Sequence, residues 1–220
     1  MNSPVENNEV IPLFPTFIWR TQLKPQEAER INTRIKSKLS ELTNTLPQLP
    51  TGGKWQTDQT LHQLEEFSDL TKVINGAARG VVEFMKLIYT SIEITGCWAN
   101  ISAPRAKHKV HTHPNNFLSG VYYVKTQEGA NTITFEDPRP QANIICPLNR
   151  EAGEENAGQM FVKVKEGTLI LFPAWLPHSV EENKSSELRI SVSFNLMFTS
   201  FGEEMSRPKW TGNVPVAAEK

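Results

Sequence analysis

Three histidines in the sequence have the residue type and spacing of a metal-binding site. His111 and His113 form an H-x-H pair, and His178 lies much further along the chain. On a β-strand, residues i and i+2 point to the same face, so an H-x-H pair can direct both imidazoles at one ion. Such a pair with one distant histidine, and no obvious fourth ligand, is typical of catalytic metal sites that keep positions open. The alternative is that both histidines of the pair are solvated surface residues.

The segment before His178 predicts a strand and a tight turn. Residues 168–172 are apolar, Pro173 ends the run, and the following AWLP delivers His178 to the start of another strand. A single histidine after a proline is often structural. Its value as a ligand therefore comes from its partnership with the H-x-H pair.

Arg189 begins a run in which polar and apolar residues alternate. The alternation predicts a strand with one polar face and one apolar face, the apolar face packing into the core or under helices. An arginine on the polar face, with Ser191 two residues later, can hold a carboxylate bidentately. Alternatively, Arg189 is a surface charge that pairs with Glu187 or Glu181. The polar positions are Arg189, Ser191, Ser193 and Asn195, and the apolar positions are Ile190, Val192, Phe194 and Leu196.

The first ninety residues predict one strand and two helices. Residues 10–23 read as an extended edge strand because they are apolar and contain prolines. Helices are predicted over 25–42, with Pro25 at the first helical position, and over 68–89, with Ser68 as N-cap. The expected buried positions are Ala28, Ile31, Ile35, Leu39 and Leu42 in the first helix, and Val73, Ala77, Val81, Phe84, Leu87 and Ile88 in the second.

After residue 90, short apolar runs alternate with turn residues, and no helical pattern separates them. This spacing favours a sandwich or barrel over a parallel α/β sheet. We therefore predict an α+β fold: a double-stranded β-helix (a cupin-like jelly roll) with N-terminal helices packed on one sheet. Within a single domain, residues 1–90 would form the strand and helices, 91–200 the β-helix and 201–220 a tail. The predicted strands are IEITGCWANIS, NFLSGVYYVKT, NTITFED, QMFVKV, GTLILF and LRISVSFNLMF.

The composition is that of an ordinary globular protein. Hydrophobic residues make up 38% of the 220 residues and the formal net charge is −1, so no basic surface for nucleic acid is indicated. The N-terminus does not resemble a signal peptide and no apolar stretch is long enough to cross a bilayer, so we expect a cytoplasmic protein with no membrane partner. Only Cys97 and Cys146 are present, without C-x-x-C spacing, which argues against a disulfide framework or a thiolate zinc site.

The chain from Trp98 to Phe198 resembles the iron(II)- and 2-oxoglutarate-dependent oxygenase superfamily, in particular a bacterial and phage branch. The matching segments are WAN (98–100), HTHPNNFLSGVYYV (111–124), FEDPRP (135–140), LFPAWLPHSV (171–180) and RISVSFNL (189–196), and LFPTFIWRTQL near the N-terminus is also similar.

The resemblance implies a hydroxylase that uses Fe(II), 2-oxoglutarate and O2, and releases succinate and CO2. It implies that His111 and His178 are metal ligands and that Arg189 binds the distal carboxylate of 2-oxoglutarate. Supporting contacts to this co-substrate are expected from Asn100, Tyr122 and Ser191. The primary substrate is not indicated, because one fold hosts many activities. The apolar N-terminal strand would also allow a homodimer.

One position departs from the pattern of the superfamily. Most members carry an aspartate or glutamate two residues after the first histidine, giving a 2-His-1-carboxylate site. This sequence has His113 there, so three histidines would hold the ion and one negative charge is missing. Alternatively, Asp137 or Glu136 supplies a carboxylate, although the Asp137-Pro138-Arg139 segment also reads as a turn with an internal ion pair.

Two other classes of protein remain open at this stage. The segment GTLILFP…HSVEEN is similar to the second motif of cupins, which would favour a three-histidine dioxygenase or a zinc or manganese isomerase without 2-oxoglutarate. The glutamate that cupins carry shortly after H-x-H is missing, since residues 114–120 contain no acid. The other class is a non-catalytic jelly-roll binding module, such as a lectin or a capsid-like domain. We also expected His108 to be exposed and His62 to be structural.

Overall fold

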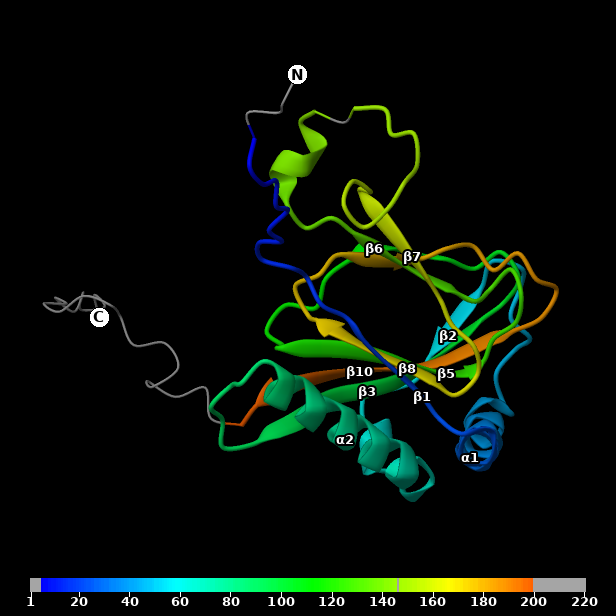
Figure 1. Ribbon diagram of the computed structural model, residues 1–220. Coiled ribbons are helices and arrows are strands. Elements are labelled where there is room, and N and C mark those ends of the chain that lie inside the picture. The colour runs from blue at the N-terminus through cyan, green and yellow to red at the C-terminus, as the bar shows by residue number, and fades with distance from the viewer. Residues whose placement is uncertain (1–4, 146, 200–220) are drawn as a thin grey trace, which may run out of the picture.

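The computed structural model describes residues 5–145 and 147–199. It consists of two antiparallel β-sheets that face each other, with two long helices covering the outer face of the larger sheet (Figure 1). The six-stranded sheet has the order β1-β8-β5-β10-β3-β2, and the four-stranded sheet has the order β4-β9-β6-β7. The strand bounds are β1 Trp19–Gln22, β2 Lys54–Gln56, β3 Ile92–Ser102, β4 His108–His111, β5 Leu118–Lys125, β6 Thr132–Glu136, β7 Gln159–Lys163, β8 Thr168–Pro173, β9 His178–Val180 and β10 Arg189–Phe198.

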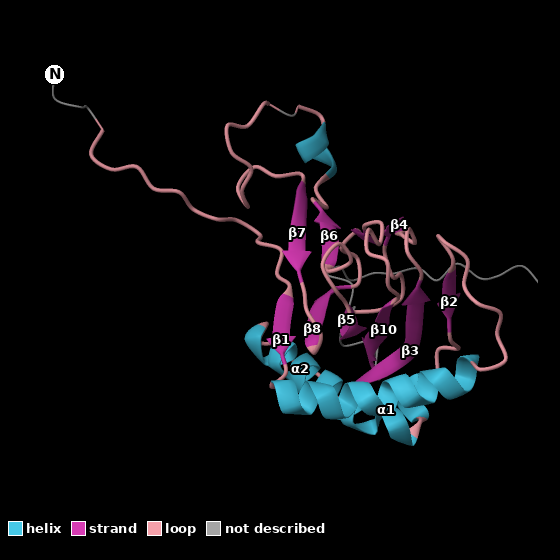
Figure 2. Ribbon diagram, turned by 90° about the vertical axis from the view of Figure 1, so that its right-hand side faces the viewer, coloured by secondary structure: helices cyan, strands magenta, loops and turns pink. Residues whose placement is uncertain are grey.

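The helices are α1 (Pro25–Thr43) and α2 (Ser68–Phe84), and both lie against the same sheet face (Figure 2). Short 3-10 turns cover Leu61–Gln63, Glu65–Phe67 and Pro140–Asn143. Each of the six strands predicted after residue 90 is present, as are both helices. The α+β double-stranded β-helix is therefore confirmed. The predicted 201–220 tail and Cys146 lie outside the described residues.

Helix α1 buries the stripe that its sequence predicts, whereas the stripe of α2 is rotated. Ala28, Ile31, Ile35 and Leu39 of α1 are buried, as expected, but Leu42 at its end is 39% exposed. In α2 the fully buried positions are shifted towards the neighbouring side of the helix, because the sheet and α1 meet that side. They are Leu70, Ile74, Ala78, Val81 and Val82, while Val73 and Ala77 only border the core.

The end of α2 corrects the predicted boundary and cap. The helix stops at Phe84 rather than at residue 89, and Lys86 adopts a left-handed backbone conformation (φ +53°) that ends the helical path. Ile88 is 97% exposed, so it belongs to no buried stripe. Ser68 is the first residue of the helix, and Phe67 occupies the cap position without a side-chain hydrogen bond.

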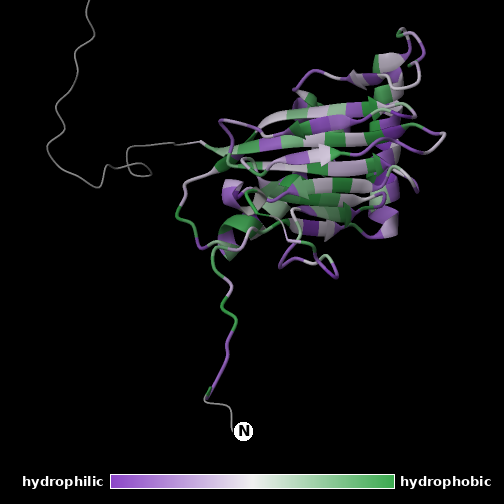
Figure 3. Ribbon diagram, turned by 90° about the horizontal axis from the view of Figure 1, so that it is seen from above, coloured by the Kyte–Doolittle hydropathy of each residue, from purple (hydrophilic) through white to green (hydrophobic). Residues whose placement is uncertain are grey.

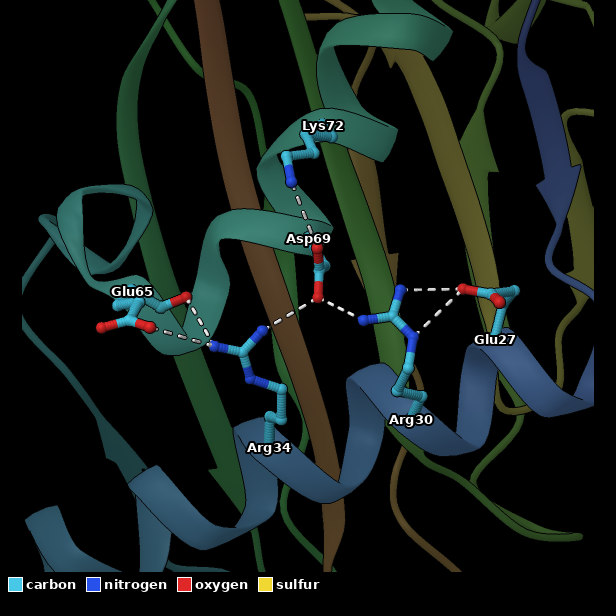
Figure 4. Close-up of polar contacts among 6 residues, drawn as sticks. All are labelled: Glu27, Arg30, Arg34, Glu65, Asp69 and Lys72. Atoms are coloured by element: carbon cyan, nitrogen blue, oxygen red, sulfur yellow. Dashed lines mark hydrogen bonds and ion pairs between the residues drawn. The ribbon is translucent and has the colours of Figure 1, made fainter.

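A charged network joins the two helices on their outer side (Figure 4). Asp69 of α2 accepts hydrogen bonds from Arg30 and from Arg34 of α1, the second at 2.9 Å. The hydrogen bond from Arg30 is the main reason that the pKa of Asp69 lies below its usual value. Glu27 and Lys72 extend the network at each end. Exposed ion pairs contribute little individually, so the network fixes the helix pair more than it stabilises the fold.

The main core lies between the helices and the six-stranded sheet. Phe194 of β10 packs there against Gly120 of β5, and a Cβ at position 120 would lie 2.4 Å from the Phe194 ring. A second, smaller apolar cluster fills part of the space between the two sheets and includes Phe135, Ile170 and Phe172. Polar and apolar residues alternate along the strands in Figure 3. The two faces of the large sheet therefore have different neighbours.

The N-terminal segment is less structured than predicted. Only Trp19–Gln22 pair as a strand, at the edge of the large sheet beside β8. Before them the chain is extended, and Val10 and Phe14 are both 94% exposed. The expected homodimer stays a prediction. Within the described part of the chain, neither α1 nor α2 has the apolar length of a membrane-spanning helix.

Candidate metal and co-substrate site

The three histidines meet at one end of the space between the sheets. His111 of β4 lies directly opposite His178 of β9 in an antiparallel pair. His113 follows β4, and its backbone N–H donates to the carbonyl of Ala174 at 2.9 Å, which fixes it beside the turn that precedes β9. One ligand atom from each ring lies within 4.8 Å of the other two. Among the described residues, this is the one cluster of three or more potential metal ligands.

Only the first histidine of the H-x-H pair lies on an assigned strand. Strand β4 ends at His111, and His113 lies two residues beyond it. The turn at Pro114 and Asn115, with Asn115 in a left-handed conformation (φ +64°), comes after His113. The ring centroids of His113 and His178 are 5.2 Å apart, and their Nε2 atoms 3.3 Å.

Backbone carbonyls set the ring orientation of two of the histidines. The Nδ1 of His111 lies 2.8 Å from the carbonyl oxygen of Lys109, and that of His178 lies 3.0 Å from the carbonyl oxygen of Leu176. Since a carbonyl only accepts, each Nδ1 carries the proton and each Nε2 presents its lone pair. Metal-binding histidines typically use this arrangement.

The surroundings also favour the neutral imidazole, which is the form that binds metal. Burial lowers the pKa of His178 to about 4, and burial together with the charge of His111 lowers that of His113 to about 4. His178 is only 4% exposed, whereas His111 is exposed at the mouth. His113 and His178 can therefore accept a divalent ion without losing protons near neutral pH.

Arg189 lies on the wall of the same cavity, which has a volume of about 250 Å³. The residue is 2% exposed, and its Nε and Nη1 have no hydrogen-bond partner among the described residues. Burial is also the main cause that lowers the pKa of its guanidinium. Glu187 instead pairs with Lys125, at 2.7 Å, so the surface-charge interpretation of Arg189 is wrong. A buried, unpartnered guanidinium is costly unless a ligand completes it.

Most of the predicted supporting residues also reach the cavity. Ser191 and Asn100 line it and are cross-strand neighbours in β10 and β3. The amide of Asn100 donates to the hydroxyl of Ser193 at 3.0 Å, which fixes the polar floor between the strands. A small cavity of this kind, apolar on one side and with a few convergent polar groups, is typical of metabolite sites.

Tyr122 does not reach this cavity, so its predicted contact with the co-substrate is wrong. Its side chain points to the helices, where the hydroxyl donates to Oδ1 of Asn32 at 2.8 Å in the main core. The next residue, Tyr123, lines the cavity opposite Ser191. The sequence contains the signal, since adjacent residues of a strand face opposite sides. It does not contain the register that decides which tyrosine faces the arginine.

The acidic alternative for the third ligand also finds no support. Both carboxylate oxygens of Asp137 are held by the side chain of Arg139, at 3.0 and 2.7 Å, as the predicted turn with an internal ion pair requires. Glu136 accepts a hydrogen bond from Gln159. Neither residue belongs to the histidine cluster.

The sequence interpretation missed His108 as a cavity residue. A register irregularity between His108 and His111 brings both side chains of β4 to the cavity, although their odd spacing places them on opposite faces of a regular strand. Burial and the charge of Lys54 lower the pKa of His108 to about 4. His62, expected to be structural, lies in the 3-10 turn near β3 and does not line this cavity.

Comparisons with known proteins agree with this site. Residues 96–195, which include all three histidines and Arg189, match the family model described as "Putative 2OG-Fe(II) oxygenase". No curated protein matches the chain significantly. The match confirms the resemblance to the 2OG-Fe(II) oxygenase superfamily that the sequence motifs indicated.

Solved structures show the same fold at low sequence identity. The carbocyclase SnoK from nogalamycin biosynthesis is 13% identical, with a TM-score of 0.60 over 93% of this chain and 90% of that chain. A Pseudomonas putida prolyl-4-hydroxylase is 13% identical, with a TM-score of 0.58 over 83% and 93%. HygX from Streptomyces hygroscopicus, with nickel and 2-oxoglutarate bound, is 12% identical, with a TM-score of 0.56 over 86% and 85%. Since the activities of these proteins differ, the fold does not fix the reaction.

Proposed function

We propose that the protein is an oxygenase that depends on iron(II) and 2-oxoglutarate and hydroxylates a substrate in the cavity between its sheets. The observation that carries this proposal is the pairing of two features in one cavity: three clustered imidazoles, and a buried guanidinium whose Nε and Nη1 have no partner among the described residues. The family match supports the same assignment, as does the structural likeness to HygX, which was solved with nickel and 2-oxoglutarate bound.

Each residue has a defined task in this proposal. His111, His113 and His178 would hold the iron. The carbonyls of Lys109 and Leu176 orient two of the rings, and the backbone hydrogen bond from His113 to Ala174 holds the third in place. Once bound, the metal and 2-oxoglutarate supply the oxidising chemistry, in which O2 is consumed and succinate and CO2 are released. The protein contributes position, charge and a dry environment.

Arg189 would bind the distal carboxylate of 2-oxoglutarate. Its guanidinium can form two parallel hydrogen bonds with a carboxylate, and Ser191 on the same strand face can donate to the same oxygens. Tyr123 lines the wall beside them and takes the supporting role first assigned to Tyr122. Since the guanidinium is buried among strand residues, it is already fixed before the acid arrives, which reduces the entropy lost on binding.

Aromatic and aliphatic side chains would exclude water from the reacting atoms. The Phe172 ring lies 4.5 Å from that of His178 and packs edge-on against Phe135 at 5.1 Å. Val121 and Ile133 complete this apolar side of the cavity. Keeping water out strengthens the electrostatic interactions of the site and limits side reactions.

The direct test is binding of metal and co-substrate to the purified protein under anaerobic conditions. We expect one iron(II) per chain, and 2-oxoglutarate binding that depends on iron, both measurable by calorimetry. His178→Ala should lose the metal, whereas Arg189→Ala should keep the metal and lose 2-oxoglutarate. In air, the wild-type protein should form succinate from 2-oxoglutarate.

Two results would contradict this proposal. Stoichiometric metal without any effect of 2-oxoglutarate would favour the cupin-like alternative, a three-histidine enzyme that does not use the acid. Absence of metal in a folded protein would leave a jelly-roll binding module. His62→Ala is the matched control, because His62 lies outside the cavity and its loss should change neither binding event.

A further inference from the structure

The cavity has an unusual charge balance for a site of the proposed kind. Its lining contains four histidines and Arg189, and within the described part of the chain no aspartate or glutamate lines it. Asp137 and Glu136, the acids that the sequence offered as an alternative third ligand, are engaged by Arg139 and Gln159. The protein itself therefore brings positive charge to this cavity and no negative charge.

The balance changes when the proposed metal and co-substrate are counted. Iron(II) contributes two positive charges and Arg189 one, while 2-oxoglutarate contributes two negative charges. A carboxylate ligand would neutralise the remainder, but the third position of this cluster is His113, and a histidine binds a metal ion as the neutral imidazole. The loaded centre therefore keeps one positive charge, which lies in a poorly solvated cavity where it acts strongly on its surroundings.

Polar residues at the open side of the cavity could place an anion near this charge. Gln56 of β2 and His108 of β4 line the cavity, and no hydrogen bond of either side chain to another described residue is found. Lys54 lies two residues before Gln56 and therefore on the same face of β2. Its ammonium donates to the carbonyl of Lys107 at 3.0 Å, so it reaches across to the start of β4.

The nearest acidic residues do not remove this charge from the cavity. Glu181 and Glu182 follow β9 and are both exposed, and neither lines the cavity. Val180 is the last residue of β9 on the cavity wall and pairs with His108. This part of the cavity wall thus carries the amide of Gln56 and the imidazole of His108, and the exposed Lys54, whose charge acts on His108, lies beside them.

From this arrangement we infer that the primary substrate is an anion whose carboxylate or similar group binds between the metal cluster and the Lys54–Gln56–His108 rim. The inference rests on the proposed function, since it counts the charges of iron(II) and 2-oxoglutarate. A cationic or neutral substrate gains nothing from the uncompensated charge, whereas an anion neutralises it.

A pair of small probes of equal shape tests the inference without any turnover. The protein is loaded with cobalt(II), saturated with 2-oxoglutarate, and titrated with acetate or with acetamide. The paramagnetic relaxation of the methyl protons measures how closely each probe approaches the metal. We expect the methyl protons of acetate to be relaxed about fivefold more than those of acetamide, which is the effect expected of one partly screened charge.

Variants of the rim and of the third ligand locate the effect. Lys54→Gln should reduce the acetate enhancement, Lys54→Arg should preserve it, and Lys72→Gln on the outer side of α2 should leave it unchanged. His113→Asp replaces a neutral ligand by a charged one. In this variant the paramagnetic relaxation of acetate should fall to nearly that of acetamide. The lysine variants keep the test decisive even if the aspartate variant does not fold.

The outcomes separate this inference from the proposed function. If cobalt(II) and 2-oxoglutarate bind but acetate and acetamide behave alike, the anionic substrate is refuted and the oxygenase assignment stands. If the acetate effect disappears as 2-oxoglutarate is added, acetate was occupying Arg189, and the inference is again refuted. If 2-oxoglutarate does not bind at all, the charge count has no basis and both proposals are lost.

Discussion

The two faces of the six-stranded sheet are made by the same strands but serve different ends. On the face that meets the helices, β5 and β10 contribute Leu118, Tyr122 and Phe194 to a closed apolar core. The buried polar pair of Tyr122 and Asn32 on this face is satisfied by a hydrogen bond. The tyrosine and the asparagine therefore complete each other within the chain, as stability requires.

On the opposite face, the same strands carry Tyr123, Arg189 and Ser191 into the cavity. Here the guanidinium of Arg189 has buried nitrogens without partners, which costs stability in the free protein. The comparison singles out Arg189, because a buried charge that folding leaves unpaired is one that a ligand can complete.

The largest effect on stability should follow from creating a cavity in the core between the helices and the six-stranded sheet. Phe194→Ala removes a fully buried ring beside Gly120, and we expect a loss of about 3–5 kcal/mol in the free energy of unfolding. Urea denaturation measures the loss. Metal binding by the folded fraction should be unchanged, since Phe194 does not line the cavity. A loss of metal affinity in folded protein would show that the two faces are not independent.

Removing the unpaired charge of Arg189 should lower the affinity for 2-oxoglutarate but should not lower the free energy of unfolding. Arg189→Met should weaken 2-oxoglutarate binding by about 1.5–3 kcal/mol, which is roughly 10- to 150-fold, because a charged hydrogen-bonded contact is lost. The free energy of unfolding should stay equal or rise, because a buried charge without a partner is removed. Calorimetry and urea denaturation, performed on the same sample, test both signs. A marked loss of stability would contradict our description of Arg189.

The two neighbouring tyrosines give the sharpest contrast. Tyr122→Phe leaves Asn32 without its donor and should cost about 1 kcal/mol of stability without changing 2-oxoglutarate affinity. Tyr123→Phe should lower that affinity and change stability less. The two variants are controls for each other, since they differ in one adjacent position. Equal effects in both assays would argue against the division between the faces.

The smallest effect concerns acid stability on the helix side. Burial lowers the pKa of His62 below its usual 6.5, so the native state binds fewer protons than the unfolded state just below that pH. Its contribution to stability is therefore present above about pH 6.5 and is lost as the pH falls. Urea midpoints at pH 7 and pH 5.5 should differ less in His62→Gln than in the wild-type protein. An unchanged difference would assign the acid sensitivity to other groups.

The sequence was sufficient for the layers of the fold and for the ligand set. Alternating patterns are local, so the strands after residue 90, the two faces of β10 and the stripe of α1 could be predicted from residue order. The histidine cluster and Arg189 could be singled out because their residue types are unusual on a strand. The resemblance to a known superfamily added the proposed ligands of these residues, and the family match and the fold comparison agree with that resemblance.

Other features were decided only by the tertiary structure: the register of paired strands, the irregularity in β4 and the packing of α2. The pairing of Ser191 with Tyr123 selected one tyrosine of two for the cavity. The irregularity in β4 brought His108 to the site, and a backbone hydrogen bond to Ala174 holds His113 beside it. Packing decided which side of α2 is buried, and it left Arg189 buried with two nitrogens unpaired. These features arise from contacts between residues far apart in the chain, and no local pattern encodes them.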